Sequence, residues 1–260
     1  MKITLIITTY NWPESLFLVL KSIENQTIFP FEVIIADDGS LNKTKKLIAN
    51  FKKKSKLKII HSWQEDKGFR AASSRNKAIL KSSGDYIILI DGDVILHPKF
   101  VADHINNSEK GYFIQGTRAL LSEGLTYKGL TNKRIQFSFF SIGIKNRKNI
   151  IHSLLLSKIF ANKNRGLRGI KSCNMSFFLN DCLKINGFNN DFEGWGKEDS
   201  EFAVRLINSG VSRKDVHFSA IQFHLWHNEN TRVSLDKNKS ILQDSINTRS
   251  QWCENGINKI

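Results

Sequence analysis

An apolar run that ends in two carboxylates is the feature that most constrains how this chain can fold. Residues 86–90, YIILI, are apolar and mostly β-branched, which is typical of a strand buried on both faces of a sheet. Asp91, Gly92 and Asp93 follow at once. A buried carboxylate is costly unless it is paired, hydrogen-bonded or bound to a metal, and ligands bind at the carboxyl ends of strands in open α/β sheets. Taken alone, the motif fits an acidic turn and a ligand site equally well.

The rest of the amino-terminal half alternates strand patterns with helix patterns. Residues 2–9, 31–37 and 56–62 are apolar runs that predict strands. Apolar residues at helical spacing lie between them, and the first of these helices opens at Trp12 and Pro13. The alternation predicts an α/β, Rossmann-like fold with a mostly parallel central sheet, right-handed crossovers and helices on both faces.

Three of the predicted strands end in acids or hydroxyls. The sequences are TTYN at 8–11, ADDGS at 36–40 and IDGD at 90–93. The carboxyl ends of parallel strands meet at one edge of a sheet, so these side chains are expected to converge on a polar ligand. Neither a dinucleotide glycine fingerprint nor a phosphate-binding loop is present.

A metal-bound nucleoside diphosphate fits this set of residues. Asp91 and Asp93, helped by Arg70 and Arg75, would meet the phosphate charge through a cation. Magnesium and manganese commonly bridge protein carboxylates to a diphosphate. At the end of the second strand, Asp37 or Asp38 could accept hydrogen bonds from a base or ribose.

The chain is strongly basic, and its charge is uneven. It has 39 Lys and Arg against 24 Asp and Glu, a formal net charge of +15, which favours anionic partners such as phosphorylated substrates, membranes or nucleic acid. No acidic residue lies between Glu123 and Asp181.

Cysteine use and the apolar segments bear on the compartment. Cys173, Cys182 and Cys253 have no metal-ligand spacing and are expected to be reduced thiols of a cytoplasmic protein. The first apolar run is too short for a signal peptide, and no segment reaches the roughly 20 apolar residues of a membrane helix.

Two blocks of motifs resemble known families. TTYN, ADDGS, GFRAASSRNKAI and DGD, in this order and spacing, resemble the nucleotide-binding half of family 2 glycosyltransferases with the GT-A fold. The resemblance covers residues 1–116 and resumes at residue 172 with CNMSFFLNDCLKINGFNNDFEGWGKEDSEFAVRL. This second block resembles the acceptor half of β1,4-galactosyltransferases and bacterial chondroitin polymerases.

The resemblance implies roles for the matching positions. A nucleotide-sugar site would comprise Thr8, Tyr10, Asn11, Asp37, Asp38, Arg70, Arg75, Asp91 and Gly92. Asp93 would ligate Mn²⁺ or Mg²⁺, and His224 and His227, in HLWH, match positions that complete the metal site in galactosyltransferases. Trp195, Gly196 and Glu198 would contact the acceptor, and Asp199 would be the catalytic base.

Elementary chemistry is compatible with these roles but leaves alternatives open. Asp199 falls in the first turn of a helix expected at 198–210, where the dipole favours a carboxylate, so simple capping is the alternative. Trp195 offers a flat apolar face to a sugar ring, although core packing is its ordinary role. Imidazole beside carboxylate suits manganese better than calcium, but a structural role is equally open for His224 and His227.

The remaining histidines and one core strand complete the second block. Structural roles are expected for His61, His97, His104, His152 and His217. MSFF, at 175–178, predicts a core strand, with Asn174 and Ser176 reaching toward the site.

The basic insert has no close family match. Residues 149–165 predict a helix with an apolar stripe flanked by basic residues, at Ile150, Ile151, Leu154, Leu155 and Ile159. Such a helix can lie on an anionic membrane surface, but packing against the catalytic domain is slightly favoured. Recognition of a phosphorylated acceptor is another use. Tail residues 233–254 predict a helix, with Trp252 docked on the core.

We therefore expect a single glycosyltransferase domain over residues 1–260. Its parts are a nucleotide-sugar-binding half (1–116), the basic insert (117–171), an acceptor and catalytic half (172–232) and a helical tail (233–260).

The predicted function is metal-dependent transfer of a hexose or N-acetylhexosamine from a UDP-sugar to a hydroxyl of a bacterial surface glycan. By resemblance, the transfer inverts the anomeric carbon. The acceptor would be a glycan or glycolipid of the lipopolysaccharide core, O-antigen or capsule, and residues 128–171 could contact the anionic inner face of the cytoplasmic membrane.

Two other classes remain open. A sugar nucleotidyltransferase would use a similar acidic sheet edge but would release pyrophosphate instead of UDP. A basic nucleic-acid-binding module would explain the charge, but the chain has no recognised nucleic-acid motif and GWGKED would be unexplained.

Overall fold

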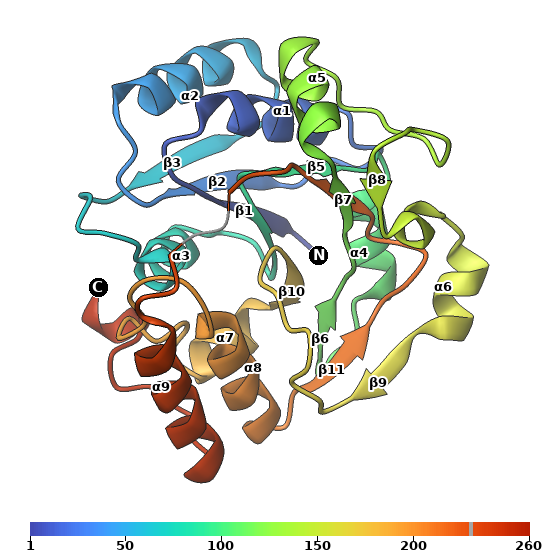
Figure 1. Ribbon diagram of the computed structural model, residues 1–260. Helices are drawn as coiled ribbons and strands as arrows, with labels where there is room; N and C mark the ends of the chain where they lie inside the picture. Colours follow the sequence, from blue (N-terminus) through green and yellow to red (C-terminus); the bar gives the residue numbers. More distant parts are fainter. Residues whose placement is uncertain (229–230) are drawn as a thin grey trace.

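The computed structural model describes residues 1–228 and 231–260. Its amino-terminal half alternates strands and helices (Figure 1): β1 (Ile3–Thr9), α1 (Pro13–Glu24), β2 (Glu32–Asp37), α2 (Asn42–Lys54), β3 (Ile59–Trp63), α3 (Ala71–Leu80) and β4 (Tyr86–Asp91). The strands predicted at 2–9, 31–37, 56–62 and 86–90 are confirmed, with ends shifted by at most three residues.

The remaining elements are shorter, and several belong to the insert. They are β5 (Val94–Leu96), α4 (Phe100–Asn107), β6 (Tyr112–Gln115), β7 (Ala119–Leu121), α5 (Glu123–Thr131), β8 (Ile144–Lys145), the 3₁₀ helix η1 (Arg147–Ile150), α6 (Leu154–Phe160) and β9 (Asn162–Asn164). There follow β10 (Asn174–Phe178), α7 (Leu179–Lys184), α8 (Glu198–Asn208), β11 (Ser212–Asp215), β12 (Gln222–His224), α9 (Leu235–Asn247) and the 3₁₀ helix η2 (Ile257–Lys259).

The central sheet has the order β3-β2-β1-β4-β10-β6-β11-β9. Strands β1 to β4 are parallel, and β10 joins β4 antiparallel. The chain runs from β1 to β2 and β3 on one side and then returns to β4 on the other. This reversal makes the β1–β4 boundary a topological switch point, where open α/β sheets bind ligands.

Alternate residues of the buried strands pack against different layers. Leu5, Ile88 and Ile90 share a core cluster with residues of α1, α2 and α4 on one face of the sheet. Ile6 and Leu89 face the opposite cluster, which contains residues of α3, α7 and α8. Tyr86 to Ile90 are all buried, so the predicted two-sided burial of this strand is confirmed.

A smaller sheet, of order β5-β12-β7-β8, lies beside α1 and α5 (Figure 1). β12 pairs antiparallel with β5, and His224 lies opposite Val94. This pairing brings the HLWH segment, at residues 224–227, next to the turn that follows β4.

The prediction of one helix at 149–165 is wrong. The segment instead contains η1, α6 and β9, and α6 is only seven residues long. The polar side of α6 faces the domain. Ser157 is buried there and shares a 2.7 Å hydrogen bond with Ser219. Leu155 and Ile159 are 69% and 63% exposed. Of the apolar stripe, Ile150 packs against the core cluster beside the smaller sheet, whereas Leu154, Leu155 and Ile159 are exposed.

The helical tail is confirmed as α9, but the docking of Trp252 is wrong. Trp252 is 47% exposed. Its neighbour Cys253 is buried instead, and the Cys253 carbonyl accepts a 2.6 Å hydrogen bond from Asn186 Nδ2. Ile257 joins the core cluster on the α8 side. The backbone turn at the end of the tail directs a cysteine and an isoleucine inward.

A buried ion pair within α8 yields a stability prediction. Arg205 is fully buried and donates to Glu201 Oε1 and Oε2 at 2.6 and 2.8 Å. We expect Glu201→Ala to lower the free energy of unfolding by about 3–5 kcal/mol, because it leaves a buried guanidinium uncompensated. Urea denaturation measures the effect.

The matched control is Asp236→Ala, which removes the exposed Lys239–Asp236 pair. An exposed pair is worth roughly 0–1 kcal/mol. Equal losses in the two variants would contradict the importance of the buried pair.

Candidate active site

The turn after β4 is fixed by its contacts with β1. Thr8 pairs with Asp91, and Gly92 N donates to Thr8 O at 2.7 Å. A Cβ on Gly92 would lie 2.8 Å from Thr9 Oγ1, so only glycine fits at this approach. Asp91 and Asp93 are thereby held at the switch point of the sheet, as the strand pattern predicts.

Asp93 forms a cluster with the two histidines of HLWH. His224 Nε2 and His227 Nε2 lie 3.5 and 3.2 Å from Asp93 Oδ2. Leu225 N donates to Asp93 O at 2.9 Å, which fixes β12 against the turn. Burial alone would raise the pKa of Asp93, but the two histidines outweigh it and lower that pKa.

The cluster has the composition and shape of a divalent-metal site. The ligand atoms of Asp93, His224 and His227 lie within 4.8 Å of one another. Asp93 Oδ1 is buried and has no hydrogen-bond partner among the described residues, so it is available to a cation. One carboxylate with two imidazoles suits manganese better than a harder ion such as calcium.

Arg75 joins this turn to α8. Its side chain is 4% exposed; Nε donates to Thr8 Oγ1 at 3.0 Å and Nη1 donates to Glu198 Oε1 at 3.0 Å. A longer contact of 3.5 Å reaches Asp91 Oδ1. Burial raises the pKa of Asp91 to about 6, and Arg75 opposes this rise.

Asp199 lies in the first turn of α8, beside Glu198. Its Oδ1 accepts from Ser200 N at 2.6 Å, and its Oδ2 accepts from Ser172 N at 3.3 Å. Burial, followed by repulsion from Glu198, raises the pKa of Asp199 to about 7. The carboxylate is oriented through one oxygen, while the other has only a long contact.

The second strand end separates its two acids. Asp38 accepts from Gln64 Nε2 at 2.6 Å and from Arg70 N at 2.7 Å. Asp37 is fully buried and bonds to His61 Nε2 at 2.7 Å and Ser40 N at 2.8 Å. The structure thus places Asp37 beneath the site, where it supports the turn that carries Asp38.

Tyr10 and Asn11 border this region from β1. The Tyr10 hydroxyl is exposed and donates to Asp66 Oδ2 at 2.8 Å, and this hydrogen bond raises the pKa of Tyr10. Asn11 Oδ1 accepts from Leu41 N at 2.8 Å and has a positive φ of 46°. Asn11 thus contacts the turn that follows Asp38, and its role in binding a nucleotide sugar stays a prediction.

Glycines shape the loop that carries Trp195. Gly194 and Gly196 have φ of +73° and +103°, and a Cβ on Gly194 would meet Ser234 Oγ at 2.4 Å. Trp195 is 40% exposed, with the Arg232 guanidinium 5.5 Å from its ring centroid. Trp195 is therefore a surface residue of the loop and is not part of the core.

Several polar residues near the site were missed from the sequence. Gln64 and Asp66 contact Asp38 and Tyr10, and Trp63 Nε1 donates to Ser40 O at 3.2 Å. Their position could have identified them, because all three lie at the carboxyl end of β3 or just beyond it, at the same sheet edge as the other candidate residues.

Arg118 was also missed, and only the fold reveals it. Its positive charge opposes the rise in the pKa of Asp91 and contributes to the lowered pKa of Asp93. Its Nη1 lies 3.6 Å from Cys173 Sγ. No recognisable motif surrounds it in the sequence.

The expectation that Asn174 and Ser176 reach the site is wrong. Both are buried in β10, where Asn174 Oδ1 and Ser176 Oγ contact the two ring nitrogens of His104 at 3.1 and 2.8 Å. Tyr86 OH also bonds Ser176 Oγ at 2.8 Å. These groups satisfy one another inside the core, and burial lowers the pKa of His104 to about 4.

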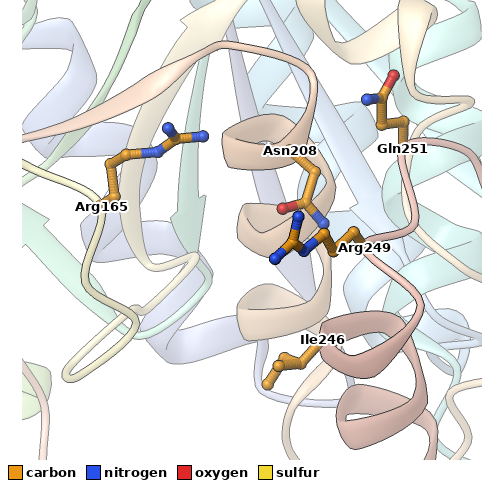
Figure 2. A pocket seen from close by; sticks show the side chains of 5 residues that line it. All are labelled: Arg165, Asn208, Ile246, Arg249 and Gln251. Atoms are coloured by element: carbon orange, nitrogen blue, oxygen red, sulfur yellow. The ribbon is translucent and has the colours of Figure 1, made fainter.

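A surface cavity of about 510 Å³ lies elsewhere. It is lined by Arg165, Asn208, Ile246, Arg249 and Gln251 (Figure 2). Asn208 ends α8 and Asp199 begins it, so about 14 Å of helix separates this cavity from Asp199. The cavity does not include the candidate active site.

The fold is that of a glycosyltransferase of GT-A type, and comparisons with known proteins identify the family. The sequence model described as glycosyl transferase family 2 matches residues 4–165. The chain belongs to this family and is an enzyme. A second model, described as N-terminal domain of galactosyltransferase, matches residues 158–228. Both predicted resemblances are confirmed.

Relatives with known names share both halves. A hyaluronan synthase of Pasteurella multocida is 27% identical over 82% of this chain, and a chondroitin synthase of Escherichia coli is 25% identical over 85%. The chain spans 24% and 34% of the lengths of these two proteins.

The fold is shared with Staphylococcus aureus TarS. Its crystal structure (residues 1–349) has a TM-score of 0.64 at 15% identity, covering 96% of this chain and 65% of that chain. A complex of the same TarS fragment with UDP-GlcNAc has a TM-score of 0.63. The predicted α/β fold of GT-A type is confirmed.

The tight fit of Gly92 gives a prediction for the site. Gly92→Ala should destabilise the protein by about 1–3 kcal/mol, because the methyl group must displace Thr9 or the turn. Displacing the turn should also weaken Mn²⁺ binding by about tenfold, since Asp93 moves with it. Thermal unfolding and calorimetric Mn²⁺ titration measure the two effects.

Gly124→Ala is the matched control, because a Cβ on Gly124 would meet nothing within 4 Å. Unchanged Mn²⁺ binding in Gly92→Ala would show that the turn does not position Asp93.

Proposed function

We propose that the protein is a metal-dependent, inverting glycosyltransferase that moves a hexose or N-acetylhexosamine from a UDP-sugar to a hydroxyl of a bacterial surface glycan. The observation that carries the proposal is the contact set of Arg75. Through Arg75, the acidic turn at Asp91 lies next to Glu198 and Asp199, so the proposed nucleotide site and the proposed base adjoin each other.

We assign the candidate residues to two sides of the proposed site, one for the nucleotide sugar and one for the acceptor. Thr8, Tyr10, Asn11 and the Asp38 turn, with Arg70, Arg75, Asp91 and Gly92, form the nucleotide-sugar side. Asp37 takes part by supporting its turn. Trp195, Gly196 and Glu198 form the acceptor side. We also propose that residues 1–116 and 172–232 act as two halves of one domain, joined by the β4–β10 pairing.

Asp199 has suitable properties for a general base. The acceptor hydroxyl gives its proton to the Asp199 carboxylate while its oxygen forms a bond to the sugar C1. The bond from C1 to the diphosphate oxygen breaks in the same displacement, and UDP leaves. A base with a pKa of about 7 is matched to neutral pH, where it is ionised and can still accept a proton.

A divalent ion held by Asp93, His224 and His227 would neutralise the charge that grows on the departing diphosphate. Manganese or magnesium is the proposed ion, with the imidazoles favouring manganese. The structures of TarS with UDP and with UDP-GlcNAc support a UDP-sugar donor by analogy of fold.

The acceptor is proposed from the relatives and the charge. The names of the hyaluronan and chondroitin synthases state that these relatives make polysaccharides. This supports a glycan or glycolipid of lipopolysaccharide or capsule as the acceptor. Such acceptors are carried at membranes, and the basic insert supports contact with an anionic bilayer at the inner face of the cytoplasmic membrane. None of the described helices is long and apolar enough to span one.

The exposed apolar side chains of the insert favour this membrane contact over packing on the domain. Phe140 and Ile142 are 85% and 90% exposed, and the outward face of α6 adds Leu155 and Ile159. Eleven Lys and Arg residues and no acid accompany them between 124 and 180. Exposed apolar side chains in a segment rich in Lys and Arg suit the boundary of anionic headgroups and acyl chains.

Replacing the proposed base tests the mechanism. Asp199→Asn should lower kcat by about 10²–10⁴-fold with UDP and Mn²⁺ binding retained, because the amide cannot take the proton. In the unaltered enzyme, kcat/KM should fall about tenfold per pH unit below pH 7, since Asp199 is protonated there, and level off above it. UDP release, measured across a panel of UDP-sugars, is the readout.

Glu123→Gln is the control, because Glu123 is an exposed acid in the first turn of α5. Near-normal turnover of Asp199→Asn would refute the mechanism. Release of pyrophosphate in place of UDP would favour a sugar nucleotidyltransferase.

Membrane contact is tested with lipid vesicles. The protein should co-sediment with phosphatidylglycerol vesicles and not with phosphatidylcholine vesicles. Leu155→Glu/Ile159→Glu should weaken this binding by at least tenfold, since it places charge on the buried face of the interface. Leu41→Glu, at an equally exposed leucine (70%) outside the insert, is the control. Equal binding by all three proteins would contradict the proposal.

A further inference from the structure

A second group of metal-ligand side chains lies outside the active site. His97 follows β5, Asp103 is in the first turn of α4, and His152 lies between η1 and α6 of the insert. One ligand atom from each lies within 4.8 Å of the other two. About 13 Å of extended chain separates His97 from Asp93, so the group is distinct from the Asp93 cluster.

Asp103 is the fixed centre of the group. It is 1% exposed, and its Oδ2 accepts from Ala220 N at 2.9 Å. His152 Nε2 lies 3.0 and 3.1 Å from the two carboxylate oxygens. A buried carboxylate is costly without a cation, and the imidazole of His152, which pairs with Asp103, is cationic only when protonated.

The distances between the ligand atoms of His152 and Asp103 are close to those between two ligands of one metal ion. In a tetrahedral zinc site with bonds of about 2.0–2.2 Å, neighbouring ligand atoms are roughly 3.3–3.6 Å apart. His152 and Asp103 are a few tenths of an ångström closer than this, as expected when a hydrogen bond occupies the space between them.

His97 can complete the set by moving its side chain alone. Its ring lies nearly parallel to that of His152, at 5.0 Å between centroids and 14° between planes. Its backbone is held, because His97 N donates to Ile221 O and its carbonyl accepts from Gln26 Nε2. Among the described residues, the ring has one hydrogen bond, at 3.2 Å from Lys99 N to Nδ1, which a rotation or tautomer change would release.

We propose that His97, Asp103 and His152 bind a divalent transition-metal ion, with Zn²⁺ as the best fit, that fastens the basic insert to the catalytic domain. Two imidazoles and a carboxylate are ligands that zinc accepts in proteins, and they discriminate against the harder Mg²⁺. The next residue, Ser153, donates from N to Phe218 O at 2.9 Å. The ion would therefore reinforce a junction between the insert and the 218–220 loop.

The test uses untagged full-length protein in which the other cluster is disabled by Asp93→Asn/His227→Ala. Calorimetric Zn²⁺ titration should give one bound ion per chain in this background, and Mg²⁺ should give none. Adding His152→Gln or His97→Gln should weaken Zn²⁺ binding by at least tenfold. His152→Gln keeps an N–H that can donate to Asp103, so the fold should be retained; circular dichroism checks this.

His217→Gln is the matched control, because His217 is an exposed histidine outside the group. Zn²⁺ should also raise the Tm of the background protein and slow tryptic cleavage within residues 128–171, and His152→Gln should lose both effects. Absence of Zn²⁺ binding in the background protein, or equal affinity in the His97, His152 and His217 variants, would overturn the proposal.

Discussion

The buried guanidinium of Arg75 is the contact on which the arrangement of the site depends. A charge that is 4% exposed must be paired, and the partners of Arg75 come from β1, β4 and α8. These elements belong to sequence blocks more than a hundred residues apart. The pairing of this one cation therefore brings the second sequence block close to the first. It also explains why Glu198 and Asp91, two acids that would otherwise repel, are held near each other.

The cluster of Asp93, His224 and His227 depends on a different long-range contact. Asp93 follows β4 directly, but its histidines arrive only because β12 pairs with β5 in the smaller sheet. The Leu225 N to Asp93 O hydrogen bond links the two at the backbone. His224 lies on β12, and Asp93 lies in the short turn between β4 and β5, so the backbone fixes two of the three positions. A preorganised set of this kind is what a metal site requires.

Local patterns in the sequence predicted much of this and missed the rest for physical reasons. The strands, the acidic turn and the start of α8 follow from short-range periodicity and from helix and turn chemistry, and they are found where expected. Asp37 and Asp38 look equivalent in the sequence, yet alternation along the strand sends one beneath the sheet edge. Asn174, Ser176 and Trp252 were misplaced because burial there is decided by tertiary partners such as His104 and Asn186. Arg118 enters only through packing of the small sheet.

The orientation of the insert also depends on tertiary contacts that local sequence patterns could not predict. Its helix α6 has an apolar stripe that suggested packing on the domain, but Ser157 bonds Ser219 and turns that stripe outward. Asp103 holds both His152 and the backbone of Ala220. The 218–220 loop therefore receives the insert on one side and leads into β12, which carries His224, on the other. The insert and the strand that carries His224 are therefore connected through this one loop.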